Sequence, residues 1–157
     1  MTPSADVTNL MTLYGTPSQA GFGSAVFDEA IEPGTDLESV AVRVYKHFVG
    51  QLWERYGETA WMSPWKRVYV RPVGIEPNIV AELRAIANST AANHVPILLM
   101  EDTEDQDKAQ QALAAVFDDP QVKDLSVYAI GDGAALSGLL VAGNRPNAIT
   151  ILISLID

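Results

Sequence analysis

The sequence predicts an α/β (or α+β) fold, a single-domain layered sandwich with a mixed sheet of about five strands, three helices and a C-terminal β-hairpin. Stretches with apolar residues three and four positions apart, typical of amphipathic helices, alternate with short runs rich in branched and aromatic residues, typical of strands. A length of 157 residues with 48% apolar content suits one hydrophobic core. Near the C-terminus, two apolar runs flank a turn rich in Gly, Asn and Pro, which favours a hairpin.

The N-terminal part has two different compositions. Residues 1–20 are rich in Thr, Pro, Ser and Gly, so we expect an irregular arm with at most a short turn of helix over residues 9–14. Residues 21–157 then form the single α/β domain, which begins with a short strand over residues 21–27.

The first helix is predicted from residue 35 to residue 56. Thr35 and Glu38 have the spacing of a capping box, and Gly57 is a typical C-terminal stop. Its apolar positions recur every three or four residues, which places them on one face of a helix: Leu37, Val40, Ala41, Val44, Phe48, Leu52 and Tyr56.

Residues 66–73 predict an edge strand. Their alternation places two valines on one face and Arg67, Tyr69 and Arg71 on the other. A polar face and Pro72 are both typical of a sheet edge, because proline donates no backbone hydrogen bond.

The middle of the chain predicts a second helix and a central strand. Pro77 suits the first turn of a helix, which we expect to end near residue 92. Residues 95–100, VPILLM, form a short continuous apolar run, the pattern of a strand covered on both faces.

The last third predicts a helix over residues 103–117 and a strand over residues 125–130. Residues 136–142 and 148–156 are the two arms of the terminal hairpin. A helix over residues 134–141 competes with the first arm.

Composition excludes several classes of protein. The chain has no cysteine, which rules out disulfides, thiolate metal sites and cysteine nucleophiles. A net charge of -10 repels nucleic-acid phosphates and anionic membranes. The N-terminus lacks a basic segment followed by an apolar one, so we expect a soluble, cytoplasmic protein with no membrane association.

Charge and aromatic residues are unevenly distributed. All three tryptophans and four of the ten basic residues lie within residues 53–71. Residues 40–75 carry a charge of +4, and residues 101–132 carry -7. Aromatic residues and arginines together are typical of protein interfaces, so this pattern predicts protein-protein binding or self-association. Self-association would give a homodimer held by the two oppositely charged regions. The predicted contact residues are Trp61, Trp65, Arg67, Tyr69 and Arg71.

Other uses of the aromatic stretch remain open. The tryptophans can simply pack against the core, and basic residues among aromatics also suit single-stranded nucleic acid, although the acidic charge opposes that use.

An alternative function is a small-molecule or nucleotide-binding enzyme. Glu101 and Asp102 follow the predicted central strand, where ligands of open α/β sheets bind, and they could hold Mg²⁺. Gly131, Asp132 and Gly133 form a glycine-containing loop after another strand. The same acids can complement a helix dipole, and the same loop can be a plain turn, so no cofactor is expected under the main hypothesis.

The two histidines, His47 and His94, give no recognisable catalytic motif. No G-x-S-x-G sequence is present, and Ser137 does not lie in such an elbow. No catalytic residue and no metal ligand can be named, and the hypothesis leans away from an enzyme.

Overall fold

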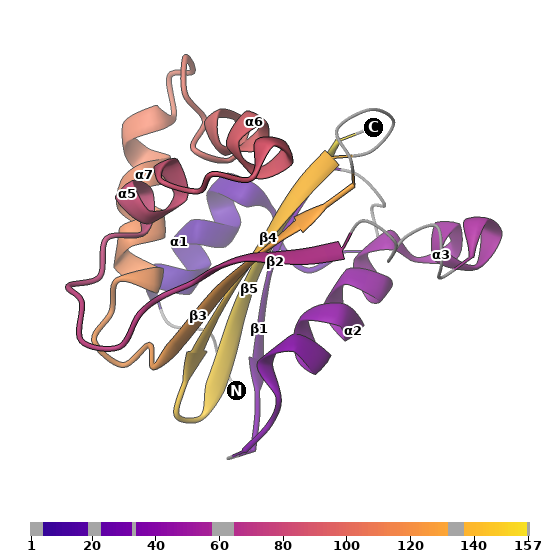
Figure 1. Ribbon diagram of the computed structural model, residues 1–157, viewed down its shortest axis with the longest axis horizontal. Coiled ribbons are helices and arrows are strands. Elements are labelled where there is room, and N and C mark those ends of the chain that lie inside the picture. Colours follow the sequence, from indigo (N-terminus) through magenta and orange to yellow (C-terminus); the bar gives the residue numbers. More distant parts are fainter. Residues whose placement is uncertain (1–4, 19–22, 33, 58–64, 132–136, 157) are drawn as a thin grey trace.

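In a computed structural model, the protein is described over residues 5–18, 23–32, 34–57, 65–131 and 137–156. A five-stranded sheet forms the middle layer, and helices cover both of its faces (Figure 1). The strands are β1 (Gly23–Ala30), β2 (Trp65–Val70), β3 (Asp124–Ile130), β4 (Ser137–Arg145) and β5 (Ala148–Ile156). The helices are α1 (Ala5–Tyr14), α2 (Leu37–Val49), α3 (Gln51–Tyr56), α5 (Ile79–Arg84), α6 (Ser89–Leu98) and α7 (Gln106–Phe117).

The strand order is β1-β5-β4-β3-β2, and every neighbouring pair is antiparallel. The α+β class, the five strands and the terminal hairpin of β4 and β5 are confirmed. The mixed sheet and the three helices are wrong, because the sheet is antiparallel throughout its described strands and the described residues form six helices.

The sheet separates two hydrophobic cores. One contains side chains of α1, α5, α6 and α7, and the other contains those of α2 and α3. Alternate residues of β5 point to opposite cores: Leu152 to the four-helix side, Ile151 and Ile153 to the α2 side. Burial on both faces therefore explains why β5 is a continuous apolar run in an antiparallel sheet.

The predicted central strand over residues 95–100 is wrong, because this segment belongs to α6. Its buried residues include His94, Val95 and Leu98, which have helical spacing. The Asn88 side chain accepts a hydrogen bond from the Ala91 amide and starts this new helix. The predicted helix over residues 77–92 is consequently divided into α5 and α6.

The first predicted helix is also divided. Gly50 adopts a φ of 66° between α2 and α3, a left-handed value that favours glycine. The N-cap residue of α2 is Asp36 and not the expected Thr35. The Asp36 carboxylate accepts a hydrogen bond from the Ser39 amide. Tyr56, expected in the core, is 59% exposed because the break at Gly50 changes the direction of its helix.

Residues 5–14, within the expected irregular arm, form α1. Val7 and Leu10 are completely buried, and the Tyr14 hydroxyl donates a hydrogen bond to the Leu98 carbonyl. The helix packs against α7 and β1 and is part of the core. At the other end of the chain, residues 137–141 form a strand, while residues 134–136 of the competing helix lie outside the described residues.

Within the described part of the chain, no helix has both the length and the apolar character needed to cross a membrane.

Candidate functional site

β2 lies at the edge of the sheet, as the sequence predicts, and its pairing with β3 is interrupted. The register shifts between Arg67 and Tyr69, which marks a β-bulge around Val68. Trp65 lies opposite Ile130, a residue of the α2 side, whereas Tyr69 lies opposite Val127, a residue of the four-helix side. The bulge therefore reverses the faces of the strand.

The expectation that Arg67, Tyr69 and Arg71 share one face is wrong for this reason. Arg67 lies opposite Tyr128 and so faces the α2 side, like Trp65. Tyr69 and Arg71 face the four helices instead. The predicted contact residues that the structure describes, Trp65, Arg67, Tyr69 and Arg71, are thus not brought together on one face, and Trp61 lies outside the described residues.

Arg71 belongs to an internal ion-pair cluster. Its side chain is only 7% exposed, and it donates two hydrogen bonds from Nε to the Glu82 carboxylate, at 2.9 and 3.1 Å, and one from Nη2, at 2.6 Å. Its Nη1 donates to the Phe117 carbonyl at 2.8 Å, and Nη2 lies 3.3 Å from Asp118 Oδ1. The Tyr69 hydroxyl donates to the same Glu82 carboxylate.

The cluster shifts the ionisation of its members in different directions. Burial alone would raise the pKa of Glu82, but hydrogen bonds from Arg71 and Tyr69 lower it overall. Burial raises the pKa of Asp118 and, with the hydrogen bond to Glu82, raises the pKa of Tyr69 to about 12. These contacts join β2 to α5 and to the end of α7, so the cluster has a structural role.

Trp65 also has a packing role. Its ring is stacked between Tyr45 at 5.3 Å and Tyr128 at 4.7 Å, and its indole N–H donates to Glu38 at 3.4 Å. Trp53, from α3, is 4% exposed and meets Tyr45 edge-on. Trp53 and Trp65, the two tryptophans that the structure describes, therefore both pack against the core, which is one of the uses that the sequence left open.

Five other exposed residues lie along or just beyond the same edge strand, and we call them the β2 edge patch. Lys66 and Arg67 are its cations, and the apolar members are Val70, Val73 and Ile75, which are 48%, 102% and 42% exposed. No backbone hydrogen bond among the described residues reaches β2 from the side away from β3. The other edge, β1, is partly covered, because the Val26 amide donates to the Gly15 carbonyl.

The alternative ligand site does not have the predicted geometry. Glu101 and Asp102 follow a helix, not a central strand, and Arg84 pairs with Glu101 at 3.0 Å. Gly131 is buried at the end of β3, and Asp132 and Gly133 lie outside the described residues. In the parts of the chain with described placement, no three acidic or histidine side chains are arranged to hold a metal ion.

His94, on α6, is buried against β4 and β5. Its Nε2 lies 2.8 Å from the Ser154 hydroxyl, and its Nδ1 lies 3.5 Å from the Ser137 hydroxyl. Burial lowers the pKa of His94 to about 4, so the ring is neutral at pH 7. The two serine hydroxyls therefore satisfy both nitrogens of a buried ring.

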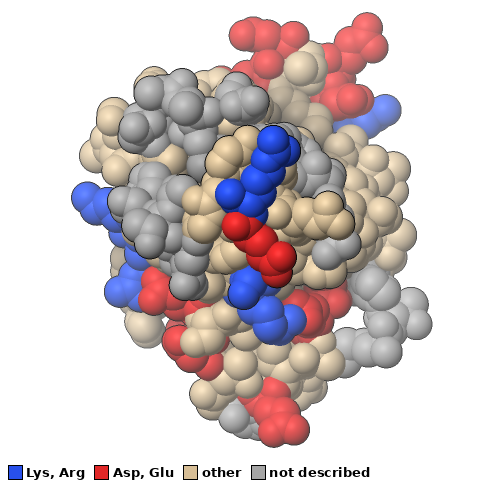
Figure 2. Space-filling model, turned by 90° about the vertical axis from the view of Figure 1, so that its right-hand side faces the viewer, with Lys and Arg blue, Asp and Glu red and all other residues tan. Residues whose placement is uncertain are grey.

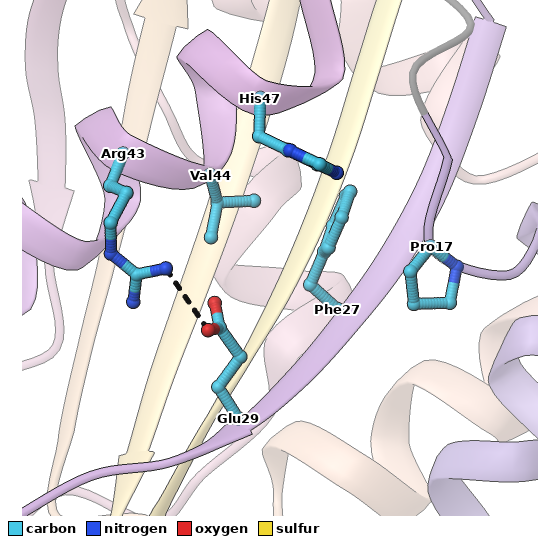
Figure 3. Close-up of a pocket in the computed structure, with 6 residues that line it drawn as sticks. All are labelled: Pro17, Phe27, Glu29, Arg43, Val44 and His47. Carbon is cyan, nitrogen blue, oxygen red and sulfur yellow. Dashed lines mark hydrogen bonds and ion pairs between the residues drawn. The ribbon is translucent and has the colours of Figure 1, made fainter.

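A cavity that sequence reasoning missed lies between β1 and α2 (Figure 3). It has a volume of about 390 Å³ and is lined by Pro17, Phe27, Glu29, Arg43, Val44 and His47. The sequence contains a weak signal of this cavity. Phe27 and Glu29 are two residues apart and so share one face of a strand, and Arg43 and His47 are four residues apart and so share one face of a helix. Neither pair is informative until the fold brings β1 and α2 together.

Figure 2 shows acidic and basic side chains interspersed on the side of the molecule where α3 lies, with no continuous basic surface there. This arrangement gives no support to nucleic-acid binding on that side. No protein-family model matches the sequence, and a search of curated proteins finds no matching relative.

Proposed function

We propose that this protein works by binding another protein, which lies as an extended segment along the β2 edge patch. One observation carries the proposal. Three of the six large apolar side chains that are exposed in the described part of the chain, Val70, Val73 and Ile75, lie within six residues at the end of an edge strand. Exposed apolar groups at an open strand edge are typical of surfaces that accept a partner strand.

The charge of the patch indicates an acidic partner segment. Lys66 and Arg67 are both exposed, and neither forms an ion pair with another residue that the structure describes. A second copy that paired through its own β2 would bring like charges together, which destabilises a strand pair. Because Lys66 and Arg67 point to opposite faces of the strand, a segment with two adjacent acidic residues followed by apolar ones would instead satisfy both the cations and the valines.

The bulge at Val68 is consistent with a selective edge. Bulges and lysines on edge strands hinder pairing with unrelated strands, because they distort the edge and add charge. Lys66 and Arg67 would favour an acidic strand over a neutral or basic one. The patch therefore combines apolar contact area with electrostatic selection.

The experiment uses anisotropy to compare two fluorescent peptides of equal length, one with a Glu-Glu pair followed by a run of Val and one with a Lys-Lys pair followed by the same run. We expect only the acidic peptide to bind, and we expect its affinity to fall as salt rises, because the paired charges are exposed. The double variant Lys66→Glu/Arg67→Glu should weaken binding about tenfold, at less than 1 kcal/mol for each exposed pair. Lys108→Glu, a single charge reversal at an exposed position of α7, should have no effect.

Equal binding of both peptides, or an equal loss in the Lys108→Glu variant, would contradict the proposal. Sedimentation of the free protein tests the homodimer. A dimer that is weakened by salt and abolished by Lys66→Glu/Arg67→Glu would show that the partner is a second copy of the chain.

A further inference from the structure

The cavity between β1 and α2 is formed by two pairs of residues that face each other. Phe27 and Glu29 are two residues apart on β1 and point to the α2 side of the sheet, and Arg43 and His47 are four residues apart on α2. The His47 ring meets Phe27 edge-on at 6.0 Å, and Arg43 Nη1 lies 3.0 Å from Glu29 Oε1 (Figure 3). The cavity therefore has an aromatic end and a charged end.

The apolar part of the cavity suits a hydrocarbon group. Phe27 is 6% exposed and Val44 is 2% exposed, so both belong to the core beneath the cavity. Pro17, from the segment between α1 and β1, lies on the far side of Phe27 (Figure 3). A volume of about 390 Å³ lies within the range of small-molecule sites.

The charged end is an ion pair that a ligand can open. The Arg43 side chain is 60% exposed and that of Glu29 is 34% exposed, so water screens their attraction and the pair stabilises the fold little. A ligand carboxylate can replace Glu29 at Arg43, and a ligand ammonium can replace Arg43 at Glu29. An anion alone would be repelled by Glu29, and a cation alone by Arg43.

We propose that this cavity binds a free α-amino acid with an apolar side chain. Its carboxylate pairs with Arg43, its ammonium pairs with Glu29, and its side chain lies against Phe27, Val44 and Pro17. The proposal is independent of the protein-binding function, since β1 and β2 are opposite edges of the sheet.

The test is an NMR titration of the imidazole carbon-bound protons of His47, with those of buried His94 as an internal reference. L-phenylalanine is compared with 3-phenylpropionate, which lacks the ammonium, and with phenethylamine, which lacks the carboxylate. We expect saturable shifts of His47 by phenylalanine with a Kd on the order of millimolar, as suits a ligand of this size. Binding of either analogue should be at least about fivefold weaker, because one charged contact is missing.

Variants give the same test from the side of the protein. Arg43→Gln and Glu29→Gln should each weaken phenylalanine binding about fivefold or more, through loss of one charged hydrogen bond. Lys46→Gln is the matched control, because Lys46 is exposed on α2 and does not line the cavity. The proposal is overturned if His47 does not respond to phenylalanine at about 20 mM, well above a millimolar Kd, if an analogue binds equally well, or if Lys46→Gln weakens binding as much.

Discussion

The internal role of Arg71 gives a prediction that can be measured without knowledge of any partner. Arg71→Ala removes the hydrogen bonds of the guanidinium to the Glu82 carboxylate. Among the described residues, the Tyr69 hydroxyl and the Asn78 amide then remain as its donors. The Glu82 side chain is only 8% exposed, so in this variant its negative charge would be largely shielded from water and would have lost its cation. Breaking a buried ion pair in this way costs about 3 to 5 kcal/mol.

Urea denaturation monitored by tryptophan fluorescence measures this cost. With a urea dependence of about 2 kcal/mol/M, the midpoint should fall by about 1.5 to 2.5 M. Arg67→Ala, at an exposed position of β2 four residues earlier, should change the free energy of unfolding by less than about 0.5 kcal/mol. The apolar double variant Arg71→Met/Glu82→Leu should recover most of the loss, because it removes both members of the buried pair and Asp118, which is 22% exposed, keeps its hydrogen bond from the Ile79 amide.

A loss below about 1 kcal/mol for Arg71→Ala would refute the structural role, since it falls well short of the cost of an orphaned buried charge. An equal loss in Arg67→Ala would refute it as well, because the effect would then belong to the strand and not to the cluster.

Three further predictions concern other buried features. The unfolded chain takes up a proton on His94 near pH 6.5 and the folded protein only near pH 4, so the free energy of unfolding should fall as pH falls through this window, by up to about 3 kcal/mol. His94→Gln should lack this part of the decline, and parallel pH slopes in urea titrations would contradict the prediction. Trp65→Ala should cost about 2 to 3 kcal/mol through loss of its stacked contacts, measured by thermal unfolding, and a neutral effect would contradict that packing role. Gly138→Ala should lower stability by at least about 1 kcal/mol, because its new Cβ would lie 2.4 Å from the Leu155 side chain; unchanged stability would show that the strand can adjust.

Much of the fold was predictable because local patterns determine it. The hairpin, the strand β3 and the helix α7 have strong turn signals or clear periodicity, and the structure contains each of them. Residues 95–100 were assigned wrongly because a short apolar run is compatible with a strand or a buried helix, and His94 and Asn88, which complete the helical pattern, lie before the run.

The candidate site was less predictable, because its geometry depends on a single inserted residue. Strict alternation along residues 66–71 groups Arg67 with Arg71, and nothing in the local sequence indicates the bulge that separates them. The partner of Arg71, Glu82, lies on α5, and only the packed structure brings the two charges together. Of the predicted contact residues that the structure describes, only Arg67 is therefore exposed.

The most direct test of the proposed function is an amide-resolved NMR titration of the ¹⁵N-labelled protein with the acidic peptide. Binding at the β2 edge patch predicts shifts that are concentrated in residues 65–75, together with slower hydrogen exchange of β2 amides in the complex. Shifts that centre on other elements, or the absence of any shift at low salt, would contradict the account.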